Sequence, residues 1–203
     1  MEEKVDILVI GGGPAGIVSA VTARKYYPDK KIFLMKDVEK GVIPCGIPYM
    51  FASLKNPEEN KLANTPLEKN NINVIVDEAI KIERKEKVVV TKSGKRYGYE
   101  KLILAIGSSP IAPPIPGINK KGVHTIYKDM SYLKNSIEEI KKTKNVLIIG
   151  GGFIGIEFAD ELSKIDKLNV SLVEILPNLL ANSFDVEFSK IGEEVLKSKG
   201  VTI

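Results

Sequence analysis

The chain has 203 residues, a net charge of +4 and a single cysteine, which excludes an intrachain disulfide framework. Acidic and basic residues are mixed throughout, a pattern typical of solvated surfaces and not of a nucleic-acid-binding patch. No apolar run is long enough to cross a bilayer and no secretory leader precedes the first strand, so we expect a cytoplasmic protein without membrane or nucleic-acid partners.

The N-terminal half begins with a strand, a glycine-rich turn, a helix and a second strand over residues 5–35, the helix covering 15–27. A short helix is expected over 47–54, because Pro48 sits early enough to be tolerated there. Short apolar stretches within 74–97 predict a small β-meander inserted into this half.

A buried strand over 101–106 is followed by a proline-rich stretch at 110–117, which is the clearest domain boundary. An amphipathic helix over 129–142 leads into a second strand–turn–helix–strand unit. A helix over 185–199 and a final strand from Val201 complete the chain.

These elements predict an α/β protein with two βαβ dinucleotide-binding units, of which the first carries the inserted β-meander. We place the first domain at residues 1–110, and the connector with the second domain at 111–203. The third strand of the second unit is where the chain stops, so that unit is expected to be incomplete.

Each unit has a glycine-rich turn of the G-x-G-x-x-G type. The first glycine permits the tight turn, the second lets the backbone approach a pyrophosphate, and the third packs the helix against the sheet. A single motif is weak evidence, but two in this context predict two bound dinucleotides and electron transfer between them. The predicted contact residues are Gly11, Gly13, Pro14, Ala15 and Gly16 in the first turn, and Gly150, Gly152, Phe153, Ile154 and Gly155 in the second.

The second strand of such a unit usually ends in an acid that binds the adenosine ribose. Glu174 has this place in the second unit, and its carboxylate favours NADH over NADPH. The corresponding strand of the first unit ends in Met35, which weakens the ribose contact there. The acids that follow, Asp37 and Glu39, are out of register.

The chain resembles the FAD-dependent pyridine nucleotide–disulfide oxidoreductases. The resemblance rests on four segments in chain order: the first glycine turn, the strand Tyr99–Gly107, Ile115–Gly117 and the second glycine turn. The resemblance covers essentially the whole chain. It implies that the first unit binds FAD and the second NAD(H), and it implies no metal site. It also assigns further cofactor contacts to Met35, Lys36, Pro44, Ala79, Ala105 and Gly107.

Residues 42–49, around Cys45, resemble the single-cysteine branch of that family, which includes coenzyme A-disulfide reductases and related NADH oxidases. A dithiol enzyme would carry a second cysteine at Met50, and a peroxidase would carry a histidine at Pro14. A helix beginning just after Cys45 would favour its thiolate. A buried structural cysteine is the alternative. The resemblance places Glu157 near the nicotinamide, the alternative being a partly exposed helix acid.

The resemblance implies that hydride passes from NADH through FAD to Cys45, which reduces a small disulfide such as coenzyme A disulfide or polysulfide, or oxygen or peroxide. An NADH:rubredoxin or ferredoxin-type reductase without cysteine chemistry is an alternative, as is a non-catalytic nucleotide-binding fragment. Members of the family continue further and form homodimers, so we expect these residues to be the N-terminal part of a longer, dimeric enzyme.

Overall fold

The computed structural model describes residues 2–203, and the α/β fold with two strand–turn–helix–strand units is confirmed. The chain folds into two compact units whose segments interleave along the sequence. The first unit comprises the chain up to Ile43, Lys61–Pro113 and Tyr127–Asp129, and the second comprises Pro44–Asn60, Pro114–Ile126 and Met130–Ile203. Assigning one cofactor to 1–110 and the other to 111–203 stays a prediction, because these units are defined by contacts and not by bound molecules.

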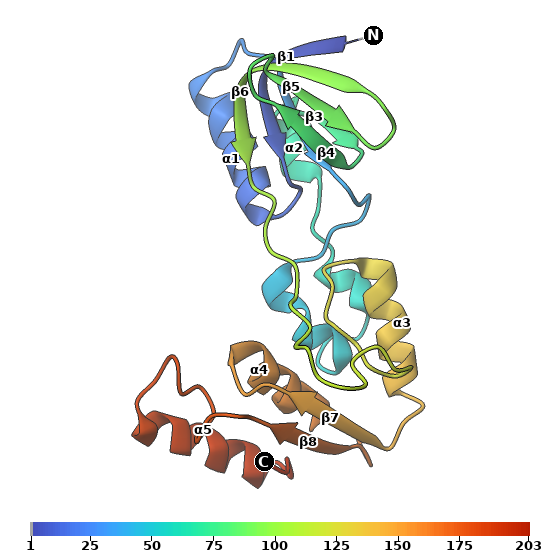
Figure 1. Ribbon diagram of the computed structural model, residues 1–203, viewed down its shortest axis with the longest axis vertical. Helices are drawn as coiled ribbons and strands as arrows, with labels where there is room; N and C mark the ends of the chain where they lie inside the picture. The colour runs from blue at the N-terminus through green and yellow to red at the C-terminus, as the bar shows by residue number, and fades with distance from the viewer. Residues whose placement is uncertain (1) are drawn as a thin grey trace. The chain divides into compact units, whose positions relative to one another are not determined.

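The first unit is built on a six-stranded sheet of order β3-β2-β1-β6-β5-β4. Figure 1 labels β1, β6 and the meander strands of this sheet together with α1. Strands β3, β2, β1 and β6 are parallel, whereas β4, β5 and β6 form an antiparallel meander. The elements are β1 (Glu2–Ile10), α1 (Pro14–Tyr26), β2 (Ile32–Lys36), α2 (Thr65–Lys69), β3 (Asn73–Val76), β4 (Ala79–Glu83), β5 (Val88–Thr91) and β6 (Arg96–Leu104).

Two details of this sheet differ from the sequence prediction. Strand β3 was expected in the meander, but it extends the parallel part of the sheet by pairing with β2. Strand β6 is one continuous strand, although the sequence prediction ends the meander at residue 97 and begins a separate strand at residue 101. Its long parallel pairing with β1 carries β6 through the residues between these two positions, because the backbone ladder does not depend on side-chain polarity.

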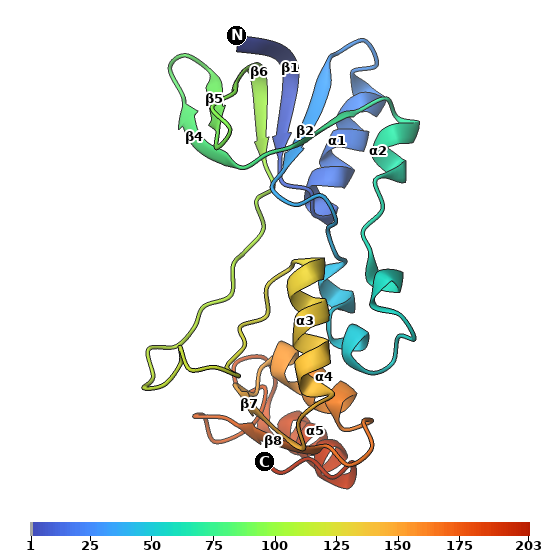
Figure 2. The ribbon, with the colours of Figure 1, turned by 90° about the vertical axis from the view of Figure 1, so that its right-hand side faces the viewer.

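Each face of this sheet contributes to a separate core. The α1 face buries Val9 and Leu34 of the strands against Ile17 and Ala20 of α1, and all four are at most 8% exposed. The other core includes Met35 and residues of β5 and β6. Figure 2 shows α1 next to β2 and α2 next to α1, with β4 and β5 at the opposite edge of the sheet. Burial on both faces holds the carboxyl ends of β1 and β2 in place, and the first glycine turn follows β1 directly.

The second unit has a two-stranded parallel sheet of β7 and β8, and α4 packs on both strands and on α5. The predicted helix over 129–142 is confirmed as α3, and the helix over 185–199 as α5. The strand expected from Val201 is reduced to one bridge between Ser171 and Thr202. The elements are α3 (Met130–Ile140), β7 (Asn145–Ile149), α4 (Phe153–Leu162), β8 (Asn169–Val173) and α5 (Val186–Ser198).

The segment Pro44–Asn60 belongs to the second unit and consists of 3-10 turns. They are η1 (Pro44–Gly46), η2 (Pro48–Phe51) and η3 (Pro57–Asn60), and η2 packs against α4. The short helix expected over 47–54 is therefore only a four-residue 3-10 turn.

Within residues 2–203, no helix is both long and apolar enough to cross a membrane. The same residues contain no group of three or more His, Cys, Asp or Glu side chains arranged to hold a metal ion.

Candidate functional site: two nucleotide-binding turns and a cysteine segment

The first glycine turn follows the carboxyl end of β1. Gly11 has a φ of +118°, and its N–H donates to the Met35 carbonyl at 2.8 Å. A Cβ on Gly11 would overlap the Ala105 carbonyl, and a Cβ on Gly16 would overlap the Gly11 carbonyl. These two glycines are therefore required by close backbone packing, as the motif predicts.

Gly13 differs from its neighbours, because a Cβ placed there would meet nothing within 4 Å. It is the N-cap of α1, which begins at Pro14 with no side-chain cap and no acidic residue in its first turn. The helix N-terminus therefore has uncapped N–H groups beside open space, which fits the pyrophosphate of a dinucleotide. The predicted contacts Ala15 and Gly16 lie in this first turn.

The second turn repeats the geometry at the carboxyl end of β7. Gly150 has a φ of +107° and donates to the Val173 carbonyl at 2.9 Å, and a Cβ on Gly155 would overlap the Gly150 carbonyl. Gly152 again faces open space and is the N-cap of α4, which has no capping side chain and no acid in its first turn. The predicted contacts Phe153 and Ile154 open α4 and are exposed.

Glu174 lies directly after β8, at the rim of this second turn. Its carboxylate accepts from the N–H of Gly151 at 2.6 Å and of Leu176 at 2.9 Å. These backbone hydrogen bonds, that of Leu176 first, lower the pKa of Glu174 below its ordinary value. The ionised carboxylate is thus fixed where the motif expects the ribose acid.

The residue in this position of the first unit is Lys36, and the expectation that Met35 takes the place of the acid is wrong. In each unit the first glycine donates to the carbonyl of the residue before this position, which is Met35 in the first and Val173 in the second. Strand β2 continues one residue further than its apolar run suggested, so Lys36 matches Glu174. Met35 is fully buried in the core.

Lys36 is only 5% exposed, although it carries an ammonium group. Its Nζ donates to the Glu39 carbonyl at 2.8 Å and to Oδ1 of Asn64 at 3.0 Å. Burial lowers the pKa of Lys36, an effect that the Glu39 carboxylate opposes and the nearby Lys61 reinforces.

The other predicted FAD contacts are distributed over the first unit and the cysteine segment. Ala105 follows β6, donates from its N–H to the Ile10 carbonyl at 2.8 Å, and borders the first turn. Gly107, two residues on, has a φ of +68°. Ala79 opens β4 and packs against the core cluster that contains Met35. Pro44 starts η1 in the second unit.

Cys45 is exposed and lies in η1, so it is not a buried structural cysteine. The helix-dipole argument for its thiolate does not apply, because only short 3-10 turns follow it. Its segment is tied to α4 of the second unit: the Ser53 N–H donates to Oε2 of Glu161 at 3.0 Å, and the rings of Phe51 and Phe158 meet edge to face at 5.0 Å. Sequence reasoning missed this attachment, because more than a hundred residues separate the partners.

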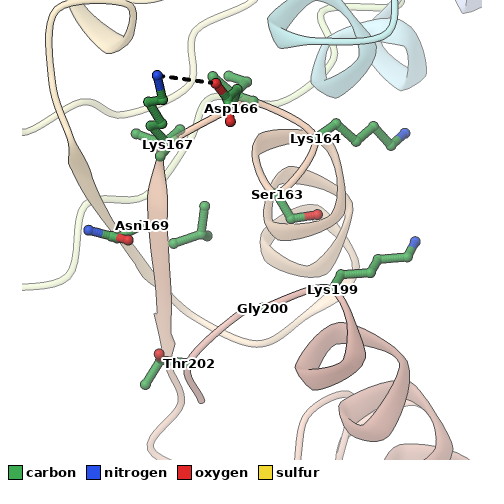
Figure 3. A pocket seen from close by; sticks show the side chains of 11 residues that line it. Ser163, Lys164, Asp166, Lys167, Asn169, Lys199, Gly200 and Thr202 are labelled. Carbon is green, nitrogen blue, oxygen red and sulfur yellow. Dashed lines mark ion pairs between the residues drawn. The ribbon is translucent and has the colours of Figure 1, made fainter.

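Glu157 is exposed on α4 and lines a hollow of about 310 Å³ together with Tyr49 of η2. A larger hollow of about 550 Å³ is lined by Ser163–Val170, Lys199, Gly200 and Thr202 (Figure 3). It includes the amino end of β8, whereas ligands of parallel α/β sheets bind at the carboxyl ends of the strands. The glycine turns, and not this larger hollow, are therefore the candidate nucleotide sites.

The chain belongs to the family described as pyridine nucleotide-disulphide oxidoreductase, which its residues 5–203 match. Membership implies FAD and NAD(H) as cofactors, in agreement with the prediction, and the open glycine turns at two helix N-termini fit both pyrophosphates.

Similar proteins carry names of this class. An NAD(P)H coenzyme A polysulfide/persulfide reductase of Pyrococcus horikoshii is 34% identical over 96% of this chain and 45% of its own length. An NADH oxidase of Methanocaldococcus jannaschii is 31% identical over 97% of this chain and 46% of its own length. A solved NAD-dependent persulfide reductase from A. fulgidus has a TM-score of 0.85 and 28% identity, and the match covers 100% of this chain and 39% of that one. The chain thus spans about half the length of the curated relatives it matches.

Proposed function

We propose that this chain provides the FAD- and NADH-binding units of an oxidoreductase in which Cys45 reduces a small disulfide. The observation that carries the proposal is the pair of uncapped helix N-termini, each with an open second glycine at Gly13 and Gly152. FAD, when bound, would accept hydride from NADH and supply the two electrons that return an oxidised Cys45 to its thiolate.

Residues of this chain bind and orient the two cofactors. The first turn and Lys36 hold the adenosine diphosphate half of FAD, and the second turn with Glu174 holds that of NADH. Ionised Glu174 accepts from a ribose 2′-hydroxyl and repels a 2′-phosphate, so NADH is preferred over NADPH. Glu157 is the residue of α4 proposed to lie near the nicotinamide.

Cys45 acts as the nucleophile towards the substrate. Its thiolate attacks one sulfur of a small disulfide such as coenzyme A disulfide or polysulfide, a mixed disulfide forms on Sγ, and the other sulfur leaves as a thiolate. Peroxide, supplied as such or formed by two-electron reduction of oxygen, would instead transfer one oxygen to Sγ to give a sulfenic acid, and its other oxygen would leave as hydroxide. The exposed position of Cys45 is compatible with either oxidant.

The proposal is tested by replacing Cys45 with serine in the FAD-loaded protein. We expect Cys45→Ser to keep NADH-dependent bleaching of the flavin absorbance while disulfide reduction falls to background. Lys55→Ser, at an exposed position of the same unit, is the matched control and should keep both activities. Full disulfide reduction by Cys45→Ser would contradict the proposal, because it would show that electrons reach the disulfide without this cysteine.

A further inference from the structure

The two nucleotide-binding turns carry opposite charges at the same position. The first glycine of each turn donates its N–H to a strand carbonyl, that of Met35 in the first turn and that of Val173 in the second. Lys36 and Glu174 are the residues that come directly after these two acceptors. Each side chain also lies against the middle glycine of its turn: a Cβ on Gly12 would approach Cβ of Lys36 to 2.7 Å, and one on Gly151 would approach Oε2 of Glu174 to 3.1 Å. The two residues are therefore equivalent in structure, and one is a donor where the other is an acceptor.

The hydrogen bonds around the two turns differ accordingly. In the second turn, the Gly151 N–H is already taken by Glu174. In the first turn, the Gly12 N–H has no protein acceptor within residues 2–203. The Lys36 ammonium has two neutral acceptors there, Glu39 O and Asn64 Oδ1, and an ammonium can donate three hydrogen bonds.

From this juxtaposition we infer that Lys36 determines the nucleotide specificity of the first site. The site favours an adenine nucleotide whose ribose carries a further phosphate over one that carries only the 5′-phosphate. The inference rests on the proposed function, in which this site binds FAD. With FAD, whose ribose is not phosphorylated, the ammonium donates to a ribose hydroxyl. A ribose phosphate offers it a full negative charge, whereas Glu174 repels such a group in the second site.

Competition with FAD measures this selectivity at the first site alone. Apoprotein is titrated with FAD, followed by flavin fluorescence, in the presence of adenosine 5′-monophosphate or adenosine 2′,5′-bisphosphate. A charge-assisted hydrogen bond contributes about 1.5–3 kcal/mol, so the bisphosphate should compete at least about tenfold better than the monophosphate. Lys36→Gln should bring this ratio close to one, Lys36→Glu should invert it, and Lys36→Arg should retain it.

A purely structural role for Lys36, tying Glu39 to Asn64, would change both affinities equally and leave the ratio unchanged. Lys61→Gln controls for general electrostatics, because it removes a nearby positive charge without altering this position. If FAD binds but the ratio is close to one in the unmodified protein, or is the same in Lys36→Gln, the inference is overturned and the proposed function stands. If FAD does not bind, both are overturned.

Discussion

Adding one methyl group at Gly13 or at Gly16 separates ligand binding from folding in the first turn. A Cβ on Gly16 would overlap the Gly11 carbonyl, whereas a Cβ on Gly13 would meet nothing within 4 Å. Gly13 also has an ordinary backbone conformation, with φ of −79° and ψ of −179°, which alanine adopts without strain. The two variants should therefore fail for different reasons.

For Gly16→Ala, the backbone must shift to relieve the overlap. Overpacking of this kind costs about 1–3 kcal/mol. In a chain of this size, about 2–4 °C of melting temperature is lost per kcal/mol, so the apoprotein should melt about 2–12 °C lower. Gly13→Ala should instead hold or slightly raise the melting temperature, because alanine restricts the unfolded chain.

For FAD binding, the new methyl group of Gly13→Ala occupies the space left for the pyrophosphate. Loss of one hydrogen bond to a charged group costs about 1.5–3 kcal/mol, which weakens FAD binding about 10- to 150-fold. Differential scanning calorimetry of the apoprotein and flavin fluorescence titration measure the two effects. The reasoning is refuted if Gly13→Ala binds FAD with unchanged affinity, or if it melts as low as Gly16→Ala.

Two further predictions concern the second unit. Glu161→Ala leaves the Ser53 N–H without its acceptor, so the unit should lose about 1–3 kcal/mol of unfolding free energy. Hydrogen exchange across Pro44–Asn60 should therefore accelerate. The attachment would be contradicted if exchange in Glu161→Ala were no faster than in the exposed control Glu157→Gln. The pKa of Glu174 is lowered in the folded state, so its charge stabilises the protein above the ordinary value of 4.5, and this contribution is lost as the pH falls from there through the folded pKa. Unfolding free energies measured between about pH 3 and pH 7 should therefore show Glu174→Gln destabilised at neutral pH and converging on the unmodified protein at the acid end, whereas a constant difference would contradict the assignment.

The glycine turns and Glu174 could be predicted from sequence because the features that define them are local. The tight turn, the open second glycine and the packed third glycine lie within six consecutive positions, and the structure places Gly11 and Gly16 as that motif requires. Glu174 directly follows an apolar strand whose end is easily recognised.

The equivalence of Lys36 and Glu174 could not be predicted from the sequence, because the burial of Lys36 depends on atoms that are distant along the chain. The apolar run of β2 stops at Met35, so the sequence alone places the end of the strand at that residue. In the structure Lys36 continues the strand, and its ammonium is held by Glu39 and by Asn64 of a separate segment. The attachment of the Cys45 segment to α4 escaped prediction for the same reason, because it depends on long-range contacts that no local pattern encodes.

The most direct test of the account is an anaerobic titration of the FAD-loaded protein with NADH, followed in the visible spectrum. Two competent nucleotide sites predict that the flavin absorbance bleaches as NADH is added, with long-wavelength thiolate-to-flavin absorbance that is lost in Cys45→Ser. A protein that takes up no FAD, or whose flavin spectrum does not change with NADH, would contradict the claim that this chain binds both cofactors for electron transfer.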